Sequence, residues 1–198
     1  MDHITHLSKD RRFKKILTNQ EPLILEERKH VYLQLCASII SQQLSTKVAK
    51  IIYKRFLDLF KSKKPSLQQI VDTPLETLRG IGLSNAKAAY VHNVCKFFIE
   101  HQITDSHLRK MSNEEIIDLL TLIKGVGKWT VEMILMFTLC REDVFAVDDL
   151  GIQQAVAKVY GLDVKNKKEL KVSMLRISAK WSPYRTYACR YLWNWKDN

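Results

Sequence analysis

The sequence predicts an all-α protein. Apolar residues recur at helical spacing along nearly the whole 198-residue chain, whereas β-branched residues never alternate with polar ones long enough to indicate a strand. Short breaks separate the apolar segments, at 61–65, 80–82, 103–106, 125–127, 141–147 and 161–166. These observations predict roughly nine to eleven helices joined by short loops.

Three of the expected helices begin with explicit start signals. Thr73-Pro-Leu-Glu combines a capping box with proline at the first helical position. Ser112-Asn-Glu-Glu is a second capping box and leads into an apolar run. Ser182-Pro183 is a third start, in which serine serves as the N-cap and proline opens the first turn.

Charge and composition narrow the classes of function. The chain has 32 Lys and Arg against 21 Asp and Glu, a formal net charge of +11 and a pI near 9.5. Such a balance favours a polyanionic partner, nucleic acid first and an anionic membrane surface second. The longest apolar run, Met133–Cys140, is too short to cross a bilayer, and no secretion signal opens the chain. Disordered, collagen-like and transmembrane classes are therefore excluded.

The cysteines and histidines lack the spacing of a metal site. The four cysteines lie far apart, so neither a C-x-x-C knuckle nor an iron–sulfur run is present. The six histidines show no H-x-x-x-H or H-E-x-x-H pattern. We therefore expect reduced thiols, no iron–sulfur cluster and no catalytic zinc.

Four of the six glycines fall in two G-x-G segments, Gly80–Gly82 and Gly125–Gly127. Each lies between two expected helices, where glycine allows positive φ and backbone N–H groups face outward at the next helix N-terminus. Such a terminus binds anions, and in a basic chain we expect a nucleic-acid phosphate. Lys124 and Lys128 flank the second hairpin and favour this interpretation over a plain helix–turn–helix corner.

The segment Leu122-Ile-Lys-Gly-Val-Gly-Lys-Trp-Thr130, followed by Asp148 and Asp149, resembles the helix-hairpin-helix (HhH-GPD) DNA glycosylases. The closer resemblance is to the DNA-3-methyladenine glycosylase II branch. Three further segments carry it: Ser41-Gln-Gln-Leu-Ser45 resembles the duplex-wedging loop, Leu78–Ala89 a second hairpin, and Trp181–Ala188 with Trp193 the C-terminal helix. The resemblance covers residues 30–195.

The resemblance implies a single glycosylase unit over residues 1–198 with two helical lobes and the active site in the cleft between them. One lobe comprises residues 33–130 and carries the hairpin; the other combines 1–32 with 131–198. The implied partner is double-stranded DNA containing a damaged base. The resemblance also implies that the protein binds it as a monomer and that no membrane takes part. The location is cytoplasm and nucleoid in a prokaryote, or nucleus in a eukaryote. No cofactor is implied beyond a monovalent cation at the hairpin carbonyls.

The resemblance also implies the catalytic group. Base cleavage passes through an oxocarbenium-like sugar, which a carboxylate stabilises while it orients water. By the family pattern this carboxylate is Asp149, and Asp148 is a cap or loop stabiliser; alternatively, both are plain N-caps. Trp129 stands where strand-cutting members have a nucleophilic lysine, so we expect hydrolysis without a lyase step.

The expected base pocket comprises Trp129, Met133, Trp181 and Tyr184. Alkylated purines such as 3-methyladenine and 7-methylguanine carry positive charge, which an aromatic face attracts. Trp181, Tyr184 and Tyr187 can equally be core residues. Met133 stands where relatives have an aromatic residue, which leaves the base preference open.

The expected DNA contacts come from two segments. One of the adjacent glutamines fills the space left by the extruded base. Lysines at helical spacing after them suit phosphates, although a solvated helix face is the alternative. The complete set is Gln42, Gln43, Ser45, Lys47, with Lys50 and Lys54 in the stripe, and Gly125, Val126, Gly127, Lys128 and Thr130 in the hairpin.

The function expected from the sequence is a monofunctional DNA glycosylase that removes alkylated purines and starts base excision repair. Two alternatives remain open: a non-catalytic helix-hairpin-helix DNA-binding module, and a glycosylase for oxidised or deaminated bases. A test for catalytic base release distinguishes the expected glycosylase from the binding module. A panel of damaged bases distinguishes it from a glycosylase for oxidised or deaminated bases.

Overall fold

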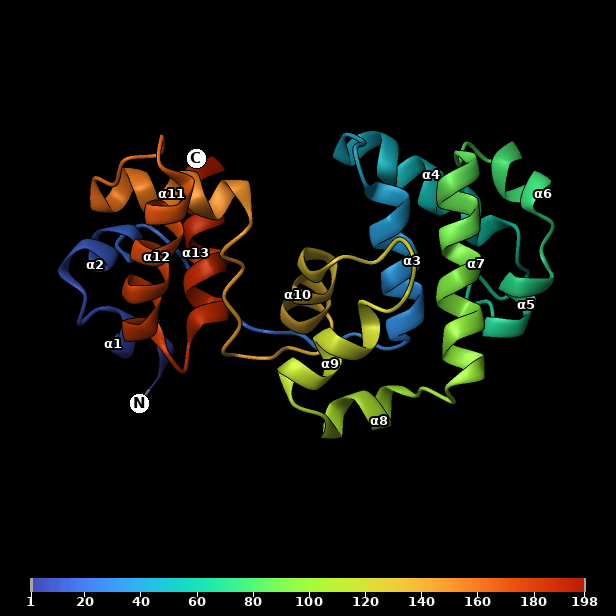
Figure 1. Cartoon of the computed structure of the whole chain (residues 1–198), viewed down its shortest axis with the longest axis horizontal. Coiled ribbons are helices and arrows are strands. Elements are labelled where there is room, and N and C mark those ends of the chain that lie inside the picture. Colours follow the sequence, from blue (N-terminus) through green and yellow to red (C-terminus); the bar gives the residue numbers. More distant parts are fainter. Residues whose placement is uncertain (1, 198) are drawn as a thin grey trace. The chain divides into compact units, whose positions relative to one another are not determined.

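The computed structural model describes residues 2–197, and every regular element in that range is a helix (Figure 1). The all-α prediction is confirmed. The chain divides into two compact units. The hairpin unit is the continuous segment Arg28–Ile134, and the terminal unit combines the residues up to Glu27 with those from Leu135 onward. The sequence predicts these boundaries at 32/33 and 130/131, a few residues away.

The hairpin unit is built around α7 (Asn85–Glu100), which packs against α3, α5 and α6, while α3 also packs against α4. Its other helices are α3 (Val31–Ser41), α4 (Thr46–Asp58), α5 (Leu67–Asp72), α6 (Leu75–Gly80), α8 (Asp105–Lys110), α9 (Asn113–Leu120) and the first turns of α10 (Lys128–Phe137). Fully buried side chains such as Leu35 and Ile39 on α3 and Val91 on α7 form its core.

Capping explains the start of α9 and corrects one predicted start. The Ser112 capping box is present, because Glu115 N donates to Ser112 Oγ at 3.1 Å and Ser112 N donates to Glu115 Oε2 at 2.6 Å. The capping box predicted at Thr73 is wrong. The Thr73 hydroxyl donates back to the Gln69 carbonyl at 2.8 Å, so Thr73 ends α5, and α6 begins after Pro74 without a side-chain cap.

The terminal unit joins both ends of the chain. Its elements are α1 (His3–Leu7), α2 (Arg11–Leu17), α11 (Leu150–Tyr160), α12 (Lys167–Ser178), the 3-10 turn η1 (Ala179–Trp181) and α13 (Arg185–Asp197). α13 packs against α11 and α2, and α11 packs against α12 and α2 (Figure 1, blue with orange to red). The helix start predicted at Ser182 is displaced to Arg185, because the Ser182 hydroxyl donates to Asp143 at 2.7 Å instead of capping.

Among residues 2–197 there are 13 α-helices, more than the sequence predicts. The excess includes α1 and α2, of 5 and 7 residues, which are too short for a helical repeat to show in the sequence. All six predicted breaks separate helices. No helix in the described part of the chain is long and apolar enough to span a bilayer.

Candidate functional site

The second glycine hairpin joins α9 to α10, and α7 fixes its shape. Gly125 has φ +105°, and a Cβ built there would lie 2.3 Å from Cγ of Tyr90 on α7. Only glycine satisfies both the backbone angle and the contact. The carbonyl of the preceding Lys124 accepts a hydrogen bond from Asn93 Nδ2 at 3.2 Å. Two side chains three residues apart on α7 therefore hold the hairpin.

The hairpin leads directly into α10, which begins at Lys128. The Lys128 ammonium is exposed and lies 4.0 Å from the buried Glu132 carboxylate. Val126 and Thr130, predicted as phosphate contacts, are only 5% and 4% exposed. Their side chains belong to the core, so only their backbone atoms are left for an anion. The hairpin thus offers the geometry of a helix N-terminus together with one exposed ammonium.

The two glutamines lie at the corner between α3 and α4 and differ in orientation. Gln42 ends α3, and its Nε2 approaches the Gly125 carbonyl at 3.5 Å. Gln43 has φ +58° and an exposed side chain. Ser45 caps α4 by accepting from Val48 N at 3.4 Å. Of the two predicted wedge residues, Gln43 is the one that faces solvent.

Lys87 of α7 holds this corner, and sequence reasoning missed it. Its Nζ donates to the carbonyl oxygens of Ile40 at 2.9 Å and Gln42 at 2.6 Å, at the C-terminus of α3. A cation there satisfies terminal carbonyls and complements the helix dipole. Burial lowers the pKa of Lys87. No signal in the sequence separates Lys87 from other lysines, because its acceptors lie more than 40 residues away in the chain.

The predicted lysine stripe lies on α4. Lys47, Lys50 and Lys54 are exposed at helical spacing, and Lys54 is 3.5 Å from the Asp58 carboxylate. An exposed ion pair of this kind is weak, so Asp58 does not cancel the charge of the three lysines. The stripe therefore keeps a positive potential.

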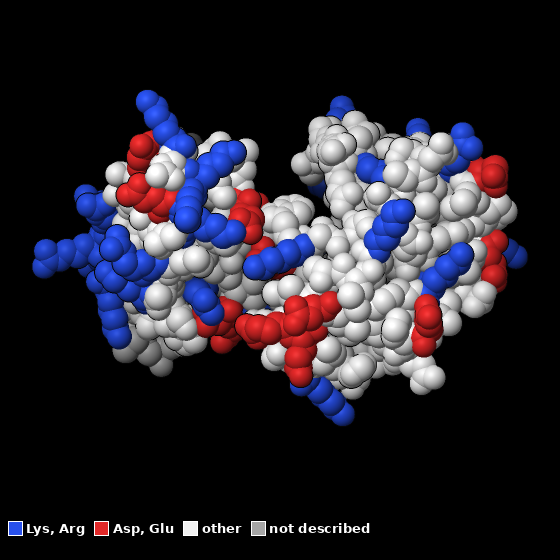
Figure 2. All heavy atoms as spheres, in the orientation of Figure 1, with Lys and Arg blue, Asp and Glu red and all other residues white. Residues whose placement is uncertain are grey.

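A second concentration of positive charge lies over α2 in the terminal unit (Figure 2). The segment 9–15 contains five Lys and Arg and one Asp. Arg12 is fixed in place, since its Nη1 donates to the Tyr160 carbonyl at 2.5 Å and its guanidinium lies 5.6 Å from the centre of the Tyr160 ring. This charge adds to the long-range attraction of a polyanion.

Asp149 is the N-cap of α11, and two donors fix its carboxylate. Oδ1 accepts from Ile152 N at 2.8 Å and from Trp193 Nε1 of α13 at 2.9 Å. A Cβ on Gly151 would lie 3.1 Å from this oxygen and 3.3 Å from the indole, so glycine keeps the approach open. Asp148 instead pairs with Lys171 Nζ at 2.7 Å on the surface. The cap and the catalytic interpretation of Asp149 are thus compatible.

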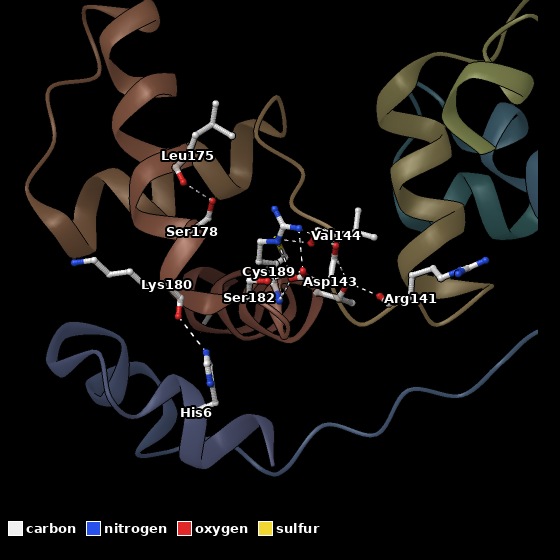
Figure 3. A network of polar contacts seen from close by, with 11 residues as sticks. His6, Arg141, Asp143, Val144, Leu175, Ser178, Lys180, Ser182 and Cys189 are labelled. Carbon is white, nitrogen blue, oxygen red and sulfur yellow. Dashed lines mark hydrogen bonds and ion pairs between the residues drawn. The ribbon is translucent and has the colours of Figure 1, made fainter. Parts of the chain in front are cut away.

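The loop before Asp149, residues 141–147, is bonded to the start of α13 (Figure 3). The Asp143 carboxylate accepts from Arg185 Nε at 2.6 Å, Arg185 Nη2 at 2.9 Å and Ser182 Oγ at 2.7 Å. Burial alone would raise the pKa of Asp143, but the hydrogen bonds from Arg185 and Ser182 outweigh it and hold this pKa below its usual range. The loop is therefore rigidly attached to α13.

Two of the four predicted pocket residues lie at the start of α10. Trp129 is 44% exposed, and Met133 follows one turn later on the same face and is half-buried. An exposed indole next to the glycine hairpin is unusual for a core residue, so its position suits contact with a base.

The other two predicted pocket residues lie in the terminal unit and differ from expectation. Trp181 is fully buried, with its ring 5.0 Å from Phe13 and 5.8 Å from Phe145, so it is a core residue rather than a pocket residue. Tyr184 is half-buried, and its ring forms a T-shaped pair with the ring of His6, with centroids 5.4 Å apart. Its environment is the N-terminal helix α1.

The described residues hold no group of three His, Cys, Asp or Glu side chains suited to a metal ion. These features together define a class of protein. They are two glycine hairpins, an outward-facing helix N-terminus and a fixed carboxylate, all in an all-helical chain. The chain belongs to the HhH-GPD superfamily of base excision DNA repair proteins, whose family model matches residues 36–180.

Similar proteins narrow the class further. The chain is 35% identical over 194 residues to DNA-3-methyladenine glycosylase 1 of Schizosaccharomyces pombe, covering 96% of this chain and 84% of the relative. It is 34% identical over 178 residues to the putative DNA-3-methyladenine glycosylase YfjP of Bacillus subtilis, covering 87% of this chain and 60% of the relative.

Solved structures agree. The S. pombe 3-methyladenine DNA glycosylase Mag1, in complex with abasic DNA, matches 98% of this chain and 96% of its own with a TM-score of 0.85 and 34% identity. The DNA-3-methyladenine glycosidase of Bacillus halodurans matches 99% of this chain and 89% of its own, also with a TM-score of 0.85, at 31% identity.

Proposed function

We propose that this chain is a DNA glycosylase that hydrolyses the N-glycosidic bond of alkylated purines and thereby starts base excision repair. The observation that carries the proposal is the Asp149 carboxylate, held on Oδ1 by Ile152 N at 2.8 Å and Trp193 Nε1 at 2.9 Å. The named activity of the S. pombe and B. subtilis relatives supports it.

Asp149 acts on the sugar. As the bond to the base lengthens, positive charge develops on the deoxyribose, and a nearby carboxylate stabilises this charge. A carboxylate already fixed by two donors needs little reorganisation when the charge appears. The same group orients the water that attacks the sugar carbon.

Trp129 acts on the base. Its exposed indole offers a stacking surface, and an aromatic face attracts the positive charge of 3-methyladenine or 7-methylguanine. A cationic purine leaves without a general acid, so one carboxylate and one aromatic surface suffice. Because Trp129 is not a lysine, no amine attacks the sugar and the reaction is hydrolytic.

The hairpin and the wedge corner act on the DNA. The start of α10 binds a phosphate through backbone N–H groups and Lys128, and Gln43 enters the duplex where the base has left. A monovalent cation fits the hairpin, since the Lys124 and Gly125 carbonyls each keep a second lone pair beside their bonds to Asn93 and Gln42, and it would offset phosphate charge. The proposed partner is double-stranded DNA containing a damaged base, bound by a monomer in the nucleoid or nucleus.

The test is single-turnover release of 3-methyladenine or 7-methylguanine from a duplex by wild type, Asp149→Asn and Asp148→Asn. Asparagine keeps the cap of α11, so the fold persists. We expect Asp149→Asn to slow release about 100- to 1,000-fold while duplex binding is retained. The matched Asp148→Asn variant loses only a surface ion pair and keeps the wild-type rate.

Two results would contradict the proposal. Undiminished release by Asp149→Asn would assign the chemistry to another group. Failure of the wild type to release any base, from alkylated, oxidised or deaminated substrates alike, would leave a DNA-binding module without glycosylase activity.

A further inference from the structure

α13 is hydrogen-bonded to the loop before Asp149 residue by residue. Thr186 alone makes three such bonds: its N donates to the Glu142 carbonyl at 2.9 Å, its Oγ1 donates to the Arg141 carbonyl at 2.5 Å, and the same Oγ1 accepts from Val144 N at 3.1 Å. The next residue adds a fourth bond, because Tyr187 Oη donates to the Glu142 carboxylate at 3.0 Å. The first half of the loop therefore follows the N-terminal turn of α13 (Figure 3).

The ion pair of Asp143 and Arg185 closes this contact. Both carboxylate oxygens take part, since Oδ1 accepts from Nε at 2.6 Å and Oδ2 from Nη2 at 2.9 Å. Ser182 Oγ adds a bond to Oδ2 at 2.7 Å, and Arg185 N adds one to Oδ1 at 3.2 Å. A planar two-bond pair of this kind fixes direction as well as distance, which a pair of apolar side chains does not.

The same helix also holds the far end of the loop. Trp193 lies about 12 Å further along α13 at the ordinary rise per residue, and its indole donates to Asp149 Oδ1. Between the two attachments, Val144, Ala146 and Val147 are buried. A single rigid helix thus sets the two ends of the segment that carries Asp149.

We propose that the Asp143–Arg185 pair is a positioning device for Asp149, which fixes the start of the loop so that the carboxylate at its end meets the sugar at the productive distance. This inference rests on the proposed role of Asp149. It adds two residues that act through Asp149 and touch no substrate. A displacement of about 1 Å at a catalytic group slows a reaction up to about 100-fold, so a positioning pair has a measurable effect.

The first test is Asp143→Asn, which keeps the shape of the side chain and removes its charge. We expect single-turnover base release about 10- to 100-fold slower, while affinity for a duplex with an abasic site changes less than about twofold. Asp10→Asn is the matched control. Asp10 caps α2 in the same unit, accepting from Arg12 N at 2.9 Å, Phe13 N at 3.2 Å and Tyr160 Oη at 2.6 Å, and none of these donors belongs to the loop. It should lower the melting temperature and leave the rate unchanged.

The decisive test combines Asp143→Asn with Asp149→Asn. If the pair acts only through Asp149, the double variant releases base as slowly as Asp149→Asn alone. Multiplying effects, an unchanged rate in Asp143→Asn, or an equal rate loss in Asp10→Asn would overturn the inference. Thr186→Val, which removes two of the loop bonds, replaces Asp143→Asn in the cycle if that variant does not fold. An inactive wild type, or an active Asp149→Asn, would instead overturn the proposed function.

Discussion

The ring of Tyr90 occupies the space that any side chain at position 125 would need, because a Cβ built on Gly125 would lie 2.3 Å from Tyr90 Cγ. Tyr90 lies one turn after Lys87 and one turn before Asn93 on α7. Lys87 donates to the corner between α3 and α4, and Asn93 donates to the hairpin. One face of α7 therefore holds both segments that we expect to meet DNA.

Gly125→Ala should weaken both the fold and DNA binding. The new Cβ requires an unfavourable backbone at φ +105° and displaces the Tyr90 ring, two effects that each cost about 1–3 kcal/mol. We expect a loss of at least about 2 kcal/mol in the free energy of urea unfolding. Gly127→Ala is the control, since nothing lies within 4 Å of its Cβ and its unfolding free energy should hardly change. Equal losses in both variants would contradict the role of Tyr90.

Lys87→Met should impair base extrusion more than DNA binding. The variant keeps the aliphatic stem but leaves the carbonyls of Ile40 and Gln42 without their cation, so the corner that carries Gln43 loosens. Release of a paired lesion should slow by about tenfold, and release of an unpaired lesion less, because an unpaired base costs less to extrude. Exposed Lys96→Met on the same helix is the control. Equal slowing on paired and unpaired substrates would count against the wedge.

Trp193→Phe should slow base release without unfolding the protein. The Trp193 ring lies 5.7 Å from that of Phe137; phenylalanine keeps an aromatic side chain there but removes the N–H that donates to Asp149 at 2.9 Å. One lost hydrogen bond to a charged group is worth about 1.5–3 kcal/mol, which corresponds to a rate loss of about 10- to 100-fold if it acts at the transition state. Single-turnover kinetics and thermal melting measure the two effects. A rate within twofold of wild type would show that the Trp193 N–H is not needed to position Asp149.

Lys47→Gln should reduce the salt dependence of duplex binding. Each phosphate contact releases condensed counterions, so losing one lowers the slope of log affinity against log salt by about 1. Lys61→Gln, in the loop after α4, should leave the slope unchanged. Titrations at several salt concentrations give both slopes, and identical slopes in the three proteins would make the α4 stripe a solvated face.

Asp143 should make stability depend on acid pH. Its folded pKa lies below the ordinary value of 3.8, so the ionised carboxylate favours the folded state. Its contribution is complete above pH 3.8 and is lost as pH falls through the folded value. The difference in unfolding free energy between wild type and Asp143→Asn should therefore be constant near neutrality and shrink below that pH. A constant difference down to pH 2 would contradict the depressed pKa.

Local signals carried most of what the sequence predicted. The hairpin at Gly125–Gly127 and the Ser112 capping box depend on residues a few positions apart, and both are present. The position of Asp149 at a helix start is equally local. Each is decided by backbone angles and nearby hydrogen bonds, which a short stretch of sequence specifies.

Long-range partners account for what the sequence did not predict. Trp181 has an aromatic side chain of the kind that lines base pockets. Only the packing of Phe13 and Phe145 around it shows that it is a core residue. Lys87 looks like any surface lysine until the end of α3 is placed beside it. The Thr73 hydroxyl could either cap α6 or bond back to α5. It donates to the Gln69 carbonyl of α5, so α6 has no side-chain cap.

The terminal unit is discontinuous, with α1 and α13 joined by a bond from His3 to the Tyr191 hydroxyl at 3.0 Å across almost the full chain. During synthesis the hairpin unit is complete well before α13 exists, because domains fold in the order in which they emerge. The first two helices pack on each other and on α11, but they lack their contacts with α13 until that helix is synthesised. A premature stop before Arg185 would therefore release both ends of the protein at once and leave Arg28–Ile134 as the part able to fold.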